Sequence, residues 1–260
     1  MNVLLTNDDG IEAPGIRTLY DSLSELVDVT VIAPANDQSA VGRQLSREVE
    51  VAEHELGYSV SGTPTDCIVA GLGALGLNPD LVVAGCNRGA NLGEYVLGRS
   101  GTVSAAVEAA FFGCPAIAVS VYFPAGDVSF EELSSKPKHY TEGVRATRYL
   151  VEHAFDDGVF ADAEYLNVNA PIPGDEPASM EITEPSKVYL MDAERNETSV
   201  KIHDRIWEQM ANGDIPDPPG TDRRAVVEGR ISVSPLTAPH TVRNSRTLTD
   251  LARTFGGDES

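Results

Sequence analysis

The chain has few cysteines, few lysines and no long uninterrupted hydrophobic run. Its three cysteines are widely spaced and form no CxxC pair, which argues against a disulfide framework and indicates a reducing compartment. No basic segment precedes the first apolar residues, so we expect no signal peptide. The longest apolar stretch, residues 109–123, is interrupted by Gly113 and Pro115, which favours a helix end and a strand over a membrane span. We therefore expect a soluble, cytoplasmic protein with no membrane partner.

Positive charge is also scarce. The sequence has 40 Asp and Glu against 19 Lys and Arg, a formal net charge of −21, and only 4 of the basic residues are lysines. A chain this acidic repels polyphosphate backbones, so we expect no nucleic-acid polymer as a partner. Excess carboxylate with few lysines predicts a cytoplasm rich in salt, where screening tolerates such charge. The alternative is acidic drift without any adaptation to salt.

What the sequence does contain is a regular alternation of strand and helix patterns. Its 260 residues are 42% hydrophobic, enough for a sizeable core, so wholesale disorder is excluded. Short apolar runs predict strands at Asn2–Thr6, Val27–Ala33, Asp80–Ala84 and Ala116–Tyr122. Helical spacing predicts helices at Pro14–Leu26, Pro64–Leu75 and Thr102–Phe112. This order predicts an α/β protein with a doubly wound, mostly parallel sheet.

The second half of the chain changes character. A helix is expected at Tyr140–His153 and a strand at Tyr165–Asn169, while Gln44–Ser61 has strand-like character beside the sheet. Later expected elements are hairpin strands around Ile182, Val188–Met191 and Ser199–Ile202, a loop at Ile215–Gly220, a strand at Val226–Val233 and a helix at Thr247–Phe255. We expect residues 1–180 to form the core. Residues 181–260 would be a β-rich extension, either part of the same domain or an oligomerisation arm.

Two adjacent carboxylates, Asp8 and Asp9, follow the first expected strand. Sites in parallel sheets lie outside the carboxyl ends of the strands, and Gly10 allows the chain to turn there. In such a loop both carboxylates can converge on a hard cation such as Mg²⁺ or Mn²⁺. A solvated turn or a helix cap remains an equally open interpretation, because Asn and Asp are favoured in both.

Polar groups follow the next two expected strands as well. Ser39 lies after the second strand and could offer a hydroxyl to a cation, or it could be an ordinary loop serine. The third strand leads into a glycine-rich loop, residues 85–93, in which Asn87 offers an amide oxygen suited to a hard cation. Arg88 in the same loop could contact a phosphate or be a surface charge. Because each segment follows a different strand of one sheet, we expect them to meet at one edge.

Ser100, Gly101 and Thr102 precede an apolar helix, whose free N–H groups can bind an anion. The alternative for these residues is an ordinary helix cap. The sequence contains no Walker A lysine, no GxGxxG after the first strand and no HExxH pair. These absences disfavour a P-loop, a dinucleotide site and a zinc site.

The chain closely resembles the survival protein SurE family of metal-dependent 5′/3′-nucleotidases. The matching stretches include Thr6-Asn7-Asp8-Asp9-Gly10, Gly62-Thr63-Pro64-Thr65-Asp66-Cys67, Gly85-Cys86-Asn87-Arg88-Gly89-Ala90-Asn91-Leu92-Gly93 and Ser100-Gly101-Thr102-Val103. The resemblance covers nearly the whole chain. With the acidic composition, it predicts a protein from a halophilic archaeon.

The resemblance implies a Rossmann-like core that binds one divalent cation per subunit, Mg²⁺ or Mn²⁺, through Asp8, Asp9, Ser39 and Asn87. It also implies that Asn91, Ser100, Gly101 and Thr102 bind the phosphate of a nucleoside monophosphate. The resemblance further implies release of phosphate from 5′ or 3′ positions and some action on short polyphosphate. It also implies a homo-oligomer, a dimer or a tetramer, formed partly through the C-terminal region.

Two departures from the family pattern are visible. Ala84-Gly85 stands where Ser-Gly is common, which is a small change. After Ser234-Pro235-Leu236 the chain does not match, in register, the Asp and His that some members carry, so His240 is only a possible catalytic group.

The expected reaction is hydrolysis of a phosphate monoester. A cation lowers the pKa of a bound water, and Asp8 or Asp9 accepts the proton of the attacking water. Helix N–H groups at Gly101 and Thr102 stabilise the developing charge. Two alternatives remain: an aspartyl-phosphate phosphatase with Asp8 or Asp9 as the nucleophile, and a non-catalytic nucleotide sensor that uses the same pocket.

Overall fold

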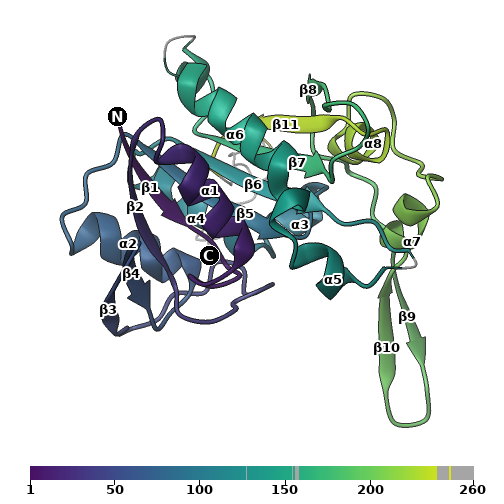
Figure 1. Cartoon of the computed structure of the whole chain (residues 1–260). Helices are drawn as coiled ribbons and strands as arrows, with labels where there is room; N and C mark the ends of the chain where they lie inside the picture. Colours follow the sequence, from purple (N-terminus) through teal and green to yellow (C-terminus); the bar gives the residue numbers. More distant parts are fainter. Residues whose placement is uncertain (127, 154, 156–157, 239–245, 247–260) are drawn as a thin grey trace, which may run out of the picture.

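A nine-stranded, mostly parallel sheet forms the centre of the molecule in a computed structural model that describes residues 1–126, 128–153, 155, 158–238 and 246 (Figure 1). The strand order is β3-β4-β2-β1-β5-β6-β7-β11-β8. Its strands are β1 (Asn2–Thr6), β2 (Asp28–Pro34), β3 (Val51–His54), β4 (Gly57–Val60), β5 (Leu81–Arg88), β6 (Ala116–Tyr122), β7 (Tyr165–Pro171), β8 (Met180–Ile182) and β11 (Ile231–Leu236). This arrangement confirms the α/β class and the parallel sheet that the sequence predicts.

Helices cover both faces of this sheet. They are α1 (Pro14–Leu23), α2 (Pro64–Gly73), α3 (Glu94–Leu97), α4 (Gly101–Phe111), α5 (Phe130–Ser134), α6 (Thr141–His153), α7 (Ile206–Ala211) and α8 (Asp222–Val227). The pleat of β1 divides the core into two layers, since successive side chains point to opposite faces. Leu5 packs in the cluster that holds the buried side chains of α1 and α6. Leu4 packs in the cluster formed with α2 and α4.

The chain adds strands on opposite sides of β1, so the direction in which the sheet grows reverses between β1 and β5. From β1 the chain crosses over α1 to β2, its parallel neighbour on one side. It later returns to β5, the parallel neighbour on the other side. A crevice opens where connections leave neighbouring strands in opposite directions, and ligands of parallel sheets bind there. The two strands that carry Asp8, Asp9 and Asn87 at their carboxyl ends are therefore the pair that flanks this crevice.

Most expected elements occur close to the expected bounds, with several differences. The strand expected at Asp80–Ala84 runs on to Arg88, with a change of register against β6 between Ala84 and Asn87. Sequence reasoning missed the short helices α3, α5, α7 and α8. The helix expected at Thr247–Phe255 lies outside the described residues.

The strand expected at Val226–Val233 is wrong in its first part. Val226 belongs to α8, and the strand begins only at Ile231. The strand expected at Val188–Met191 is also misplaced, because β9 (Met191–Arg195) starts at its last residue. Val188 and Val226 instead pack in the small cluster around Leu92. Burial in that cluster overrides the local β preference of valine.

The part of the chain after residue 180 contributes to two separate sheets. β8 and β11 extend the main sheet, with β11 antiparallel to β7 and parallel to β8. The strands β9 and β10 (Val200–Asp204) pair only with each other, and this ribbon projects from the body of the molecule (Figure 1). Within the described ranges, the helices are too short or too polar to cross a membrane. The division into a core and an extension at residue 180 stays a prediction.

Candidate functional site

The loops that follow β1 and β2 are tied together at the crevice. The N–H of Gln38 donates to the carbonyl of Asp8 at 2.7 Å, and the N–H of Ile11 donates to the carbonyl of Pro34 at 2.8 Å. Gly10 has a φ of +98°, and a Cβ there would lie 3.3 Å from the carbonyl carbon of Asn36. Glycine is required at this turn because an L side chain would meet both an unfavourable φ and the neighbouring loop.

Asp8 is buried and held by the first turn of α4. The N–H of Thr102 donates to its Oδ2 at 3.1 Å, and the Thr102 hydroxyl donates to its Oδ1 at 2.5 Å. Burial, and then repulsion by Asp9, raise the pKa of Asp8 to about 7, although the two hydrogen bonds from Thr102 lower it. The Asp8 carboxyl is therefore poised to change charge near neutral pH and would bind a cation best when ionised.

Asp9 faces the opposite wall of the crevice. Its Oδ2 accepts a hydrogen bond from the N–H of Arg88 at 2.8 Å, and its Oδ1 lies 3.4 Å from Nε of Arg88. Burial raises the pKa of Asp9, while the hydrogen bond and the charge of Arg88 lower it. Among the described residues Oδ1 accepts no hydrogen bond although it is fully buried. A buried carboxylate oxygen without a hydrogen bond is costly, so a ligand that compensated its charge would be favoured there.

Ser39 reaches this wall only indirectly. It is exposed, and both its N–H and its hydroxyl donate to Oδ1 of Asp37, at 2.8 and 2.6 Å. The other oxygen of Asp37 accepts from Nη2 of Arg88 at 2.7 Å. Sequence reasoning missed Asp37. An aspartate two residues before a serine is a pattern of Asx turns, so the signal was present but did not point to the site.

The glycine-rich loop places Asn87 and Asn91 in different surroundings. Asn87 is the last residue but one of β5, and its Nδ2 donates to the carbonyl of Gly89 at 2.6 Å. Its amide oxygen accepts no hydrogen bond within the described part of the chain. Asn91 lies among the polar side chains of β6 and β7: it donates to Ser120 at 2.9 Å, and its N–H donates to Asn169 at 2.7 Å. Within the described part of the chain, Asn91 is hydrogen-bonded to this network and not to Asp8 or Asp9.

The residues at the start of α4 cap the helix and bring its backbone close to Asp8. The N–H of Val103 donates to the Ser100 hydroxyl oxygen at 3.1 Å, so Ser100 is a helix cap, and its own hydroxyl proton remains available. A Cβ on Gly101 would lie 2.8 Å from both Cβ and Oδ2 of Asp8. Gly101 therefore allows the helix to approach Asp8, a function that the sequence did not indicate.

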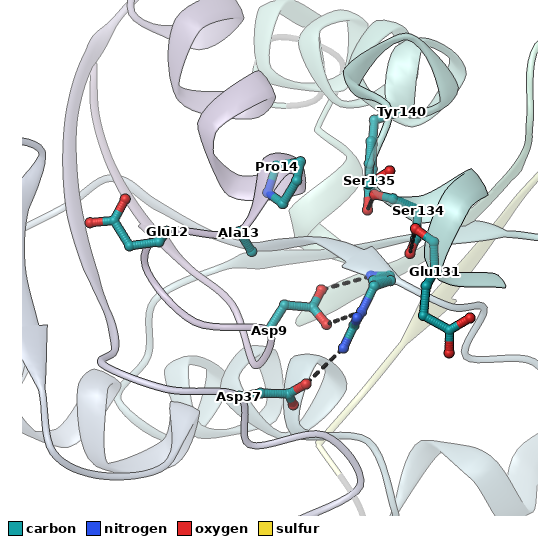
Figure 2. Close-up of a pocket in the computed structure, with 10 residues that line it drawn as sticks. Asp9, Glu12, Ala13, Pro14, Asp37, Glu131, Ser134, Ser135 and Tyr140 are labelled. Atoms are coloured by element: carbon teal, nitrogen blue, oxygen red, sulfur yellow. Dashed lines mark hydrogen bonds and ion pairs between the residues drawn. The ribbon is translucent and has the colours of Figure 1, made fainter. Parts of the chain in front are cut away.

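A pocket of about 360 Å³ opens beside Asp9. Figure 2 shows Asp9 and Asp37 on one side of it and Ser134, Ser135 and Tyr140 on the other. Its walls come from the start of α1, the loop after β2, the end of β5 and helix α5. Of the ten described residues that line it, Arg88 is the one with a positive charge. The pocket has room for a small organic group next to the carboxylates.

The side chains at the crevice fit a hard divalent cation. They offer two carboxylates, the amide oxygen of Asn87 and hydroxyls, which are the oxygen donors that Mg²⁺ and Mn²⁺ prefer. Burial raises the pKa of both Asp8 and Asp9, so a bound cation would favour their ionised forms. The described residues hold no group of three His, Cys, Asp or Glu side chains suited to a metal. A cation held by Asp8 and Asp9 would therefore need neutral oxygens to complete its ligands.

Residues 3–192 match the family model of the survival protein SurE. The chain is 68% identical over 256 residues to the 5′-nucleotidase SurE of Natronomonas pharaonis, covering 98% of this chain and 100% of that protein. It is 60% identical over 258 residues to the 5′-nucleotidase SurE of Haloarcula marismortui, covering 99% and 96% of the two chains. Both relatives come from halophilic archaea. The crystal structure of the SurE protein from Aquifex aeolicus is similar, with a TM-score of 0.76, 29% identity, and 98% and 99% of the two chains covered.

Proposed function

The chain belongs to the survival protein SurE family, and on that premise we propose that it is a divalent-cation-dependent 5′-nucleotidase. It would hydrolyse nucleoside monophosphates to a nucleoside and inorganic phosphate. The observation that carries the proposal is the pair of buried carboxylates, Asp8 and Asp9, at the crevice between β1 and β5. The sequence similarity to proteins named 5′-nucleotidase supports the same activity.

We assign the cation, one Mg²⁺ or Mn²⁺ per subunit, to Asp8, Asp9, Asn87 and Ser39. When bound, such a cation lowers the pKa of a water molecule and neutralises phosphoryl oxygens. Three of these residues lie at the ends of the strands that flank the crevice. Ser39 is linked to them through Asp37 and Arg88. Its direct participation would require a rotation of the hydroxyl away from Asp37.

The chain's own groups bind and orient the substrate. The free hydroxyl proton of Ser100 and the N–H of Gly101 lie at the start of α4, where a helix attracts anions. The N–H and the hydroxyl of Thr102 donate to Asp8, so we assign Thr102 to holding that carboxylate in place. Asn91 holds the glycine-rich loop in place, and its second Nδ2–H could donate a hydrogen bond to a phosphate oxygen. Asp9, next to the pocket, would accept a proton from the attacking water.

The proposed homo-oligomer, a dimer or a tetramer, draws support from the β9–β10 ribbon. Val200 and Ile202 on β10 are 58% and 67% exposed. An isolated two-stranded hairpin is marginally stable in water, so a ribbon with exposed apolar side chains favours contact with another copy. Light scattering of the wild type and of Ile202→Asp tests this: the variant should have a lower mass if the ribbon contributes to assembly.

A panel of cations and substrates tests the function. Purified protein is offered 5′- and 3′-nucleoside monophosphates, short polyphosphate and a generic phosphate ester, each with Mg²⁺, Mn²⁺ or EDTA, and phosphate release is measured. We expect release from 5′-monophosphates that depends on the cation; 3′-nucleotidase and exopolyphosphatase activities are further proposals that the panel decides. Binding of nucleotide without turnover would show a sensor instead. A trapped phosphoenzyme would show an aspartyl-phosphate mechanism.

A further inference from the structure

Arg88 lies where it can compete with a cation and also hold a phosphate. Its Nε lies 3.4 Å from Oδ1 of Asp9, and its Nη2 donates to Asp37 at 2.7 Å. The side chain is one-third exposed, and its guanidinium lies over the ring of Phe130, 5.8 Å from the centroid. It is thus anchored between two carboxylates and still open to the pocket.

The oxygen that Arg88 approaches is the buried Asp9 oxygen that accepts no hydrogen bond within the described structure. At 3.4 Å the guanidinium gives this oxygen charge compensation but no well-formed hydrogen bond. A divalent cation on Asp9 would supply that compensation more strongly. It would also repel the guanidinium, because both carry positive charge. Arg88 and a cation bound there would therefore compete for one carboxylate.

We propose that Arg88 neutralises Asp9 while the site lacks a cation, and turns to the phosphate of the substrate once a cation is bound. This inference rests on the proposed function. Arg88 is the one positively charged residue among those that line the pocket. A guanidinium offers a planar fork of donors that matches two oxygens of a phosphate. The exchange needs only a rotation of a partly exposed side chain away from Asp9.

The backbone makes this proposal testable by substitution. Asp9 is also held by the N–H of Arg88, at 2.8 Å, which any residue at position 88 except proline can donate. Arg88→Ala therefore removes the guanidinium and leaves this support of Asp9 in place. Arg88→Lys keeps the charge and loses the fork.

Arg43→Ala is the matched control. Arg43 has a similar exposed fraction, an ion pair with Glu108 at 2.8 Å, and a guanidinium 4.9 Å from the centroid of the Phe111 ring. It does not line the pocket beside Asp9. Its removal changes the net charge by the same amount, so it corrects for the general attraction of cations to a more acidic protein.

The experiment measures two affinities in constant high salt. Mn²⁺ binding is titrated without nucleotide, and inorganic phosphate binding is titrated with Mn²⁺ present. Relative to Arg43→Ala, we expect Arg88→Ala to bind Mn²⁺ about twofold to fivefold more tightly. This factor corresponds to the free energy of one partly exposed ion pair, which the cation no longer has to break. We expect this variant to bind phosphate at least about tenfold more weakly, because a charge-assisted hydrogen bond to the phosphate is lost. Arg88→Lys should bind Mn²⁺ like the wild type and phosphate with intermediate affinity.

The opposite signs of the two effects separate this proposal from a structural role of Arg88, which would weaken both affinities. Phosphate affinity equal to that of Arg43→Ala would overturn the phosphate contact. Mn²⁺ affinity no tighter than in Arg43→Ala would overturn the competition. If the wild type binds no Mn²⁺, the proposed function itself fails. If the wild type binds Mn²⁺ and hydrolyses nucleotides while Arg88→Ala behaves like the control, only the inference about Arg88 is wrong.

Discussion

Thr102 donates two hydrogen bonds to Asp8, one from its backbone N–H and one from its hydroxyl, across 94 positions of sequence. The first turn of α4 therefore holds a carboxylate of the chain itself next to the position proposed for the substrate phosphate. This arrangement stabilises a buried negative charge at the positive end of a helix. It also makes the position of Asp8 depend on the residues that begin α4.

Gly101→Ala is expected to impair turnover because the new Cβ would lie 2.8 Å from Cβ and Oδ2 of Asp8. Either the helix or the carboxylate must shift, which costs about 1–3 kcal/mol of stability. A shift of the carboxylate should lower kcat by about 10²-fold. Thermal unfolding and phosphate release with Mn²⁺ measure the two effects.

Gly98→Ala is the control for this substitution. Gly98 has a φ of −75°, and a Cβ there would meet no heavy atom within 4 Å. We expect nearly wild-type kcat from it. Equal activities of the Gly98 and Gly101 variants would show that the close approach of Gly101 to Asp8 has no importance for the reaction.

The pKa of Asp8, about 7, predicts that cation affinity rises with pH up to about that value. Below it the carboxyl is protonated, so the Mn²⁺ dissociation constant should increase by up to about tenfold for each pH unit. Isothermal titration with Mn²⁺ between pH 5.5 and 8.5 measures this dependence. An Mn²⁺ affinity that does not change with pH would contradict it.

The same raised pKa affects the stability of the cation-free protein. Because the folded state holds the Asp8 proton more tightly than the unfolded state, its contribution to stability is complete below pH about 4 and is lost as pH rises towards about 7. Asp8→Asn removes this dependence, and in EDTA its Tm should exceed that of the wild type at pH 8 by roughly 2–4 °C for each kcal/mol relieved. The advantage should shrink at pH 4. A variant less stable than the wild type at pH 8 would contradict the assignment.

Asp9→Asn should nearly abolish phosphate release and leave the fold intact. The amide cannot supply the negative charge for a cation and cannot accept the proton of the attacking water. We expect a loss of at least about 10²-fold in kcat/KM with either Mg²⁺ or Mn²⁺. Asp21→Asn, an exposed aspartate on α1, is the charge-matched control. Wild-type turnover by Asp9→Asn would remove Asp9 from the site.

Ser100→Ala separates a phosphate contact from a plain helix cap. As a cap, the hydroxyl contributes about 1 kcal/mol to stability and its loss would have little effect on turnover. As a donor to the phosphate, its loss should lower kcat by roughly 10²-fold, and we expect this larger effect. Ser100→Thr keeps the hydroxyl and should restore most of the rate. If the alanine variant hydrolyses nucleotides at the wild-type rate, the phosphate binds elsewhere.

High salt is expected to stabilise the protein. A net charge of −21 makes the compact state repel itself, and screening reduces this as the Debye length falls from about 10 Å at 0.1 M to about 3 Å at 1 M salt. Exposed ion pairs weaken as well, but each contributes little. The Tm at constant cation concentration should rise between the two conditions. A Tm that stays level or falls would argue for acidic drift.

The sequence alone predicted the sheet and the edge at which the candidate site residues gather. Apolar runs with helices between them require parallel strands, and parallel strands bring their carboxyl ends to one edge. The positions of Asp8, Asp9 and Asn87 at that edge follow from this local pattern. The bounds of short elements did not follow, as Val226 shows, because a few buried contacts around Leu92 decide whether it is helical.

Only the tertiary structure decided which polar groups meet within the site. It joined Asp8 to Thr102, Arg88 to both Asp9 and Asp37, and Asn91 to the side chains of β6 and β7. Each of these contacts links segments that are far apart in the sequence, and each depends on distances within a few tenths of an ångström. Hydrophobic periodicity carries no information at that scale. The sequence thus determined the sheet edge at which these polar side chains gather, and the packing of loops and helix ends determined which of them contact one another.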